Sequence, residues 1–87
     1  MKIVLSPRTE KQLRNLPKFD QIAIAEKIRN LPQSQQSGEE KLSGFPGIYR
    51  VRVGNYRIVY KKLADSFYIV IIRHRRDVYR LVKDLLG

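Results

Sequence analysis

The chain has 87 residues, of which 43% are hydrophobic, so it can form one small globular domain and is too hydrophobic to be disordered. It has no cysteine, which excludes disulfides and thiolate metal sites, and no apolar stretch approaches the roughly 20 residues of a membrane span. We expect a soluble cytoplasmic protein, because the N-terminal residues lack the apolar segment of a secretion signal. The formal net charge of +10 favours a polyanionic partner such as nucleic acid, with an acidic protein as the alternative.

The first predicted elements are a short strand at residues 2–5 and a helix directly after it. Ser6 and Pro7 form a helix-start pattern, because serine caps free backbone N–H groups and proline fits the first helical position. We expect this helix to extend to about Leu16, since Pro17 cannot continue it.

A second helix is predicted over 18–31. Its apolar stripe has helical spacing and consists of Ile24, Ile28 and Leu31, supported by Ile22 and Ala25. Residues 33–38 are polar and have no apolar period, which indicates a loop.

Three strands are predicted next, at 47–53, 56–62 and 67–73. Only two or three residues separate them, and connections this short require antiparallel pairing. A short terminal helix, or a strand followed by a helix, is expected within 77–86. The sequence therefore predicts a single α+β domain, in which two N-terminal helices pack on one face of a small antiparallel sheet and leave the other face available.

The first candidate site lies on the predicted strands. Side chains alternate across a strand, so Arg50 and Arg52 share one face, and Arg57 on the next strand is expected to face the same side. Three arginines on an exposed face can bind phosphates. The alternative is an ordinary solvated polar face.

A second basic cluster follows the last predicted strand and contains Arg73, His74, Arg75 and Arg76, with Tyr79 as its aromatic member. The surrounding cations would favour the phenolate of Tyr79, and its ring could stack on a base. The alternatives are a core aromatic for Tyr79 and a structural hydrogen bond for His74, the single histidine.

Other kinds of site have little support. No glycine-rich phosphate loop and no metal-ligand spacing are found, and we expect Glu39 and Glu40 to be solvated at the end of the polar loop. A cationic site without a metal can still cleave RNA, because the 2′-hydroxyl of RNA is an internal nucleophile. The site then needs only to align it and to neutralise the charge that develops on the phosphate.

Three segments resemble the RelE/ParE superfamily of type II toxin–antitoxin toxins. They are Lys41-Leu42-Ser43-Gly44, the run Tyr-Arg-Val-Arg-Val-Gly-Asn-Tyr-Arg-Ile-Val-Tyr at 49–60, and His-Arg-Arg-Asp-Val-Tyr at 74–79. The resemblance covers nearly the whole chain and is closest to the RelE branch.

This resemblance implies roles for particular residues. Arg57, Arg75 and Tyr79 are the implied catalytic residues: the arginines stabilise the transition state, Tyr79 orients or activates the 2′-hydroxyl, and Arg75 helps to protonate the leaving oxygen. Arg73 or Arg76 could serve in place of Arg75. The implied RNA and phosphate contacts are Arg50, Arg52, Lys41, Arg73, Arg76 and His74.

The resemblance also implies a function. It predicts a metal-independent and cofactor-free endonuclease that cuts messenger RNA in the ribosomal A site and leaves a cyclic phosphate. An acidic cognate antitoxin would wrap the basic surface in a hetero-oligomeric complex. The alternatives are a ParE-type inhibitor of DNA gyrase and an inert basic module that binds only an acidic partner.

Overall fold

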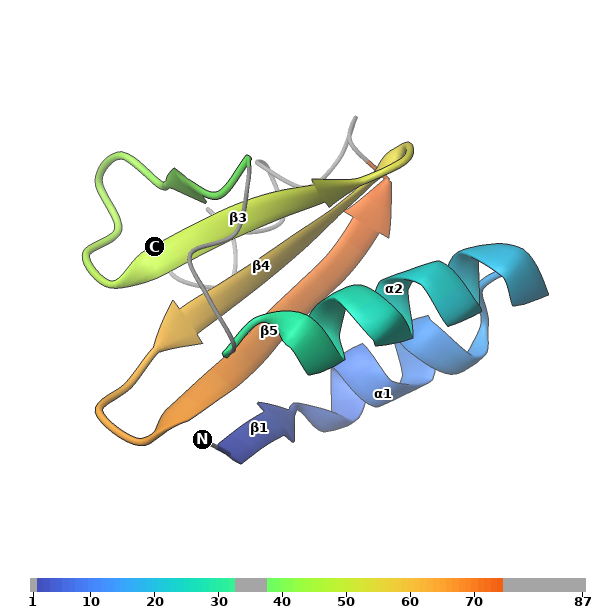
Figure 1. Cartoon of the computed structure of the whole chain (residues 1–87), viewed down its shortest axis with the longest axis horizontal. Helices are drawn as coiled ribbons and strands as arrows, with labels where there is room; N and C mark the ends of the chain where they lie inside the picture. Colours follow the sequence, from blue (N-terminus) through green and yellow to red (C-terminus); the bar gives the residue numbers. More distant parts are fainter. Residues whose placement is uncertain (1, 33–37, 75–87) are drawn as a thin grey trace.

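The computed structural model describes residues 2–32 and 38–74, and Figure 1 shows the arrangement of their elements. In chain order they are β1 (Lys2–Leu5), α1 (Pro7–Arg14), α2 (Lys18–Asn30), β2 (Glu40–Lys41), β3 (Ile48–Val53), β4 (Tyr56–Lys62) and β5 (Ser66–His74). The predicted elements are confirmed to within two residues at each end, while β2 was not predicted. The terminal helix expected within 77–86 lies outside the described residues.

The strands form one five-stranded sheet in the order β1-β5-β4-β3-β2. The antiparallel pairing predicted for β3, β4 and β5 is confirmed, and Gly54 begins the β3–β4 turn with the positive φ of 57° that such tight turns require. The predicted antiparallel sheet describes β2 to β5, but β1 pairs parallel with β5, so the sheet as a whole is mixed. Two helices separate β1 from the other strands, so no short connection sets its direction.

Both helices cover the same face of the sheet, with α2 packed across it in Figure 1. The main core is made of Ile24, Ile28 and Leu31 from the α2 segment and of Val51, Ile58, Tyr60, Phe67, Ile69 and Ile72 from the sheet. The predicted apolar stripe is therefore confirmed, except for Ile22, which is 54% exposed. Two residues span about 200° of helix, so Ile22 and Ile24 point in nearly opposite directions.

Side chains of α1 complete the edge of β5. The predicted cap is confirmed, since the Ser6 hydroxyl accepts a hydrogen bond from the Thr9 N–H at 3.1 Å. The buried Thr9 hydroxyl donates to the Ile69 carbonyl at 3.0 Å, and Gln12 Oε1 accepts from the Ile72 N–H at 2.9 Å. Because β1 pairs with β5 only as far as Ile69, these side chains replace a backbone neighbour along the rest of that edge.

The face opposite the helices is only partly available. A second apolar cluster is buried there and consists of Leu42, Ile48, Val59 and Ile71. The expectation of a free second face therefore holds only for the end of the sheet where the arginines lie. Neither described helix is long and apolar enough to cross a membrane.

Candidate functional site

Three arginines form a row across the three central strands. In the register of the sheet, Arg52 of β3 lies directly opposite Arg57 of β4, and Arg57 lies directly opposite Arg73 of β5. Cβ atoms of such cross-strand partners are about 5 Å apart, and the two side chains lie on the same face. Arg50 lies two residues before Arg52 and shares that face. We call these four residues (Arg50, Arg52, Arg57 and Arg73) the arginine face.

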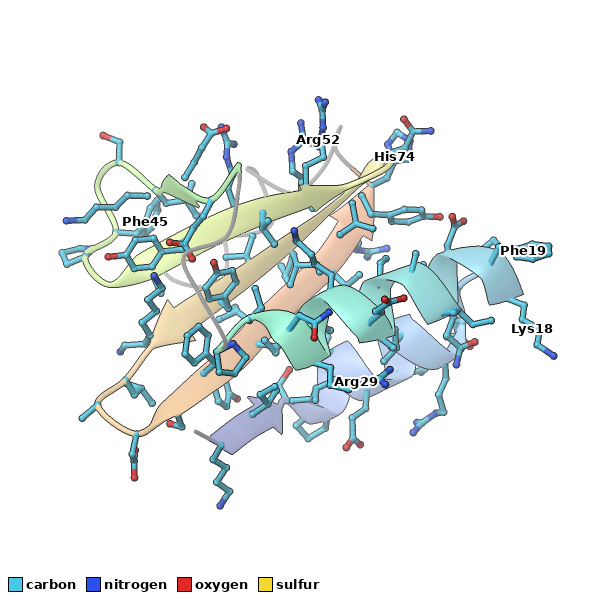
Figure 2. All side chains as sticks on the ribbon, viewed as in Figure 1. Lys18, Phe19, Arg29, Phe45, Arg52 and His74 are labelled. Carbon is cyan, nitrogen blue, oxygen red and sulfur yellow. The ribbon has the colours of Figure 1, made fainter. Side chains whose placement is uncertain are left out.

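The arginine face points away from the helices. Val51 and Ile58, the neighbours of Arg52 and Arg57, belong to the core beneath α2, so the arginines project from the other side. Figure 2 shows Arg52 directed away from α1 and α2. The prediction that Arg50, Arg52 and Arg57 share one face is confirmed. The same face also carries buried apolar residues, one on each of β3, β4 and β5 and each two positions from an arginine. They are Ile48, Val59 and Ile71.

The arginine face contains a hollow of about 300 Å³, lined by Gly38, Glu40, Arg50, Arg52 and Arg57. Arg52 and Arg73 are exposed, whereas Arg50 and Arg57 are half-buried, and Nη1 of Arg57 is buried. Guanidinium groups bind phosphate through paired N–H donors, and they do so more strongly where water is partly excluded. The hollow therefore has the size and charge to hold one phosphate of a chain.

An acidic side chain also reaches this hollow. Glu40 Oε2 lies 3.0 Å from Arg50 Nη2, and the Glu40 side chain is 64% exposed. The register explains the contact, because β2 pairs with β3 so that Glu40 lies opposite Arg50. The expectation that Glu40 would be solvated missed this ion pair.

Glu39 is almost fully buried, contrary to expectation. Its side chain is 9% exposed, accepts a hydrogen bond from the Tyr60 hydroxyl and lies 2.8 Å from Lys62 Nζ. Lys62 Nζ also lies 4.3 Å from the centroid of the Tyr49 ring. Burial, followed by the hydrogen bond to Glu39, raises the pKa of Tyr60 above its usual value. These contacts fix the segment that precedes β2 and so position Glu40 beside the arginine face.

The structure places two other predicted contact residues away from the arginine face. Lys41 lies opposite Tyr49 in the register and therefore on the helix-covered side, at the exposed end of the sheet. His74 lies opposite Tyr56, also on that side, and their rings meet edge to face at 6.0 Å between centroids. Arg75, Arg76 and Tyr79 lie outside the described residues.

Within residues 2–32 and 38–74, no group of three His, Asp or Glu side chains is arranged to hold a metal ion. The chemistry available from the described side chains of the arginine face is therefore binding of phosphate and neutralisation of its charge.

Comparisons with known proteins agree on one family. The sequence profile of the family described as "ParE toxin of type II toxin-antitoxin system, parDE" matches residues 3–79. Toxin RelE3 of Methanocaldococcus jannaschii is 27% identical over 84 residues, which span 91% of this chain and 96% of that protein.

Solved structures show the same fold. The RelB–RelE antitoxin–toxin complex from Methanococcus jannaschii has a chain with a TM-score of 0.72 and 25% identity, covering 87% of this chain and 94% of that one. A mutant of E. coli toxin RelE in the free state has a TM-score of 0.78 and 18% identity, and the match covers 99% of this chain and 97% of that one.

Proposed function

The chain belongs to the ParE toxin family of type II toxin–antitoxin systems, within the RelE/ParE superfamily. We propose that it acts as the RelE branch does, as a metal-independent, ribosome-dependent mRNA endonuclease, and its similarity to Toxin RelE3 supports this choice. One observation carries the proposal. The register brings Arg52, Arg57 and Arg73 into a continuous row on one face of a rigid sheet. Such a row of like charges opposes folding, and guanidinium groups at this spacing are suited to binding the phosphates of RNA.

In the proposed reaction, the 2′-hydroxyl of the RNA attacks the adjacent phosphorus and expels the 5′-oxygen of the next nucleotide. Arg57, at the centre of the row, neutralises the charge that builds up on the phosphorane. Arg50 and Arg52 hold the flanking backbone and keep the attack in line. Tyr79 orients or activates the 2′-hydroxyl, with its phenolate as the acceptor of the proton, and Arg75 assists protonation of the leaving oxygen. The products are a 2′,3′-cyclic phosphate and a free 5′-hydroxyl.

The proposal includes two partners. Similar chains crystallise in complexes described as RelB–RelE and YoeB–YefM toxin–antitoxin pairs, and we propose an acidic antitoxin for this chain, since its net charge is +10. The antitoxin would cover the arginine face and block access to RNA. The second partner is the ribosome, whose A site would present the messenger RNA in a conformation suited to attack.

The direct test is to induce the chain without its antitoxin and to map the ends of ribosome-bound transcripts. We expect new cleavage sites in messenger RNA whose upstream fragments end in cyclic phosphate, and we expect Arg57→Ala to abolish most of them. Intact ribosome-bound messages during growth arrest would contradict the proposal.

Inhibition of DNA gyrase is the second candidate function, and the match to the ParE family profile is the observation that favours it. Such an inhibitor acts by binding a protein and cuts no RNA itself. Induction would then produce DNA breaks while messenger RNA remains intact, and Arg57→Ala would have no effect on transcript ends.

A further inference from the structure

A second cavity lies away from the arginine face, between α1 and the end of β5. Its volume is about 640 Å³, roughly twice that of the hollow on the arginine face. Arg8, Lys11 and Asn15 line it from the α1 segment, because residues three, four or seven positions apart share one side of a helix. Arg73 and His74 line it from β5. We call this cavity the α1–β5 groove.

The groove is cationic. Arg8 and Lys11 are both exposed, and neither makes an ion pair with another described residue. No Asp or Glu is among the described residues that line the cavity. Arg8, Lys11 and the exposed Arg73 therefore line one cavity, which is an arrangement suited to an extended anion.

The groove also has an apolar side. Leu16, Pro17 and Tyr56 line it beside the cations. Aromatic and apolar surface next to Lys and Arg fits a base or ribose with its phosphate, since every base can stack on an aromatic ring. An acidic peptide would use the cations but would gain little from Tyr56, so this combination favours nucleic acid over protein.

The groove and the arginine face are continuous through one residue. Arg73 lies directly opposite Arg57 and also lines the groove. This is feasible because β1 pairs with β5 only as far as Ile69 and the hydrogen bonds from α1 reach Ile72, so the Arg73 side chain lies beyond both at the sheet edge. Figure 2 shows His74 at the same end of the sheet as Arg52, so the two sites occupy one end of the molecule.

We propose that the α1–β5 groove binds the phosphodiester backbone of single-stranded RNA, next to the segment held on the arginine face. Arg8 and Lys11 contact phosphates there, and Tyr56 stacks on a base. This inference rests on the proposed function, because it takes RNA as the ligand, but it concerns affinity and not cleavage.

The experiment measures binding of the full chain to a fluorescent RNA of about 12 nucleotides with 2′-O-methyl groups, which cannot be cleaved. The double variant Arg8→Ala/Lys11→Ala is compared with Lys18→Ala/Arg29→Ala, which removes the same charge from exposed positions of α2 outside the groove. Alanine suits all four helical positions, so both variants are expected to fold. Affinity is followed between about 50 and 200 mM salt.

We expect the groove variant to reduce the slope of log affinity against log salt by about 1.4, since each lost phosphate contact on a single strand removes about 0.7. The α2 variant should leave the slope unchanged. Tyr56→Leu should weaken RNA binding roughly fivefold with an unchanged slope, and should not alter binding of poly-glutamate.

Three results would overturn the inference. The first is an equal salt slope for the groove and α2 variants. The second is an equal loss of affinity for poly-glutamate and for RNA in Tyr56→Leu. The third is weaker ribosome binding by the groove variant with an unchanged RNA isotherm, which would assign the groove to ribosomal RNA. Failure of the proposed function would give a different result. The wild-type chain would bind the uncleavable RNA through the groove but would not cleave messenger RNA.

Discussion

Arg52 and Arg57 are register partners on adjacent antiparallel strands, so two guanidinium-bearing side chains leave the same face of the sheet about 5 Å apart at Cβ. Opposed like charges destabilise a strand pair, and Arg73 repeats the arrangement on the other side of Arg57. The charge of this row therefore opposes folding, which is the expected behaviour of a binding site and not of a structural element.

The first prediction concerns stability. Arg52→Thr removes one of the opposed charges and introduces a β-branched residue that suits a strand. We expect the melting temperature to rise by about 2–4 °C, corresponding to roughly 0.5 kcal/mol, while RNA affinity falls. Lys61→Thr is the control, because Lys61 is an exposed residue of β4 whose register partners are Ile48 and Tyr68. An equal or larger rise in melting temperature for the control would show that repulsion within the arginine row does not destabilise the fold.

The second prediction concerns cleavage. Arg57→Ala should lower the single-turnover rate of ribosome-dependent mRNA cleavage by about 10²–10³-fold, or roughly 3–4 kcal/mol of transition-state stabilisation. Lys61→Ala, on the same strand, should cleave at the wild-type rate. Circular dichroism establishes that both variants are folded. A folded Arg57→Ala protein with wild-type activity would remove this residue from the reaction.

The third prediction concerns Glu40, whose carboxylate competes with phosphate for Arg50. An exposed ion pair contributes only about 0–1 kcal/mol, so a phosphate can displace Glu40 at low cost. Glu40→Gln should raise the affinity for uncleavable RNA about two- to fivefold and change stability by less than about 1 kcal/mol. Glu26→Gln removes the same charge from an exposed position on α2 and should have little effect. Equal gains from both variants would mean that only net charge matters.

The fourth prediction concerns pH. The pKa of Tyr60 is raised above 10.0 in the folded state, because burial and the hydrogen bond to Glu39 disfavour the phenolate. Tyr60 thus has no effect on the pH dependence of stability below pH 10, where both states are protonated. Above pH 10 the unfolded chain loses this proton first, so the free energy of unfolding should fall by up to about 1.4 kcal/mol per pH unit.

Urea unfolding of the wild-type and Tyr60→Phe proteins from about pH 8 to pH 11 measures this effect. The titration of lysines is common to both proteins and cancels in the difference between the two curves. Their difference in unfolding free energy should be constant up to pH 10 and should then change in favour of Tyr60→Phe. Parallel curves over the whole range would show that Tyr60 ionises freely in the folded protein.

Much of the fold could be predicted from local rules. Apolar periodicity located both helices, and the two-residue Gly54-Asn55 turn fixed the pairing of β3 with β4. Alternation along that hairpin was enough to place Arg50, Arg52 and Arg57 on one face. The direction of β1 was not predictable in this way, because it depends on packing across two intervening helices.

The charged contacts around the site were less accessible from sequence. Glu39 is separated from Tyr60 by 21 residues, and no periodicity links a loop residue to a strand at that distance. Tertiary packing of α1 makes Arg8 and Arg73 line the same groove. The sequence shows that both residues are basic, but it does not predict that they line one cavity. Short-range patterns thus predict which residues share a strand face and fail where a loop or helix packs on a distant strand.

Both edge strands of the sheet are short. β1 has four residues and β2 has two, and beyond β1 the side chains of Thr9 and Gln12 already occupy backbone groups of β5. This matters because residues 67–72 form an uncharged, β-branched segment of the type that stacks into amyloid-like zippers. By bonding to the edge of this strand, the side chains of α1 occupy backbone groups with which a strand of another chain could otherwise pair.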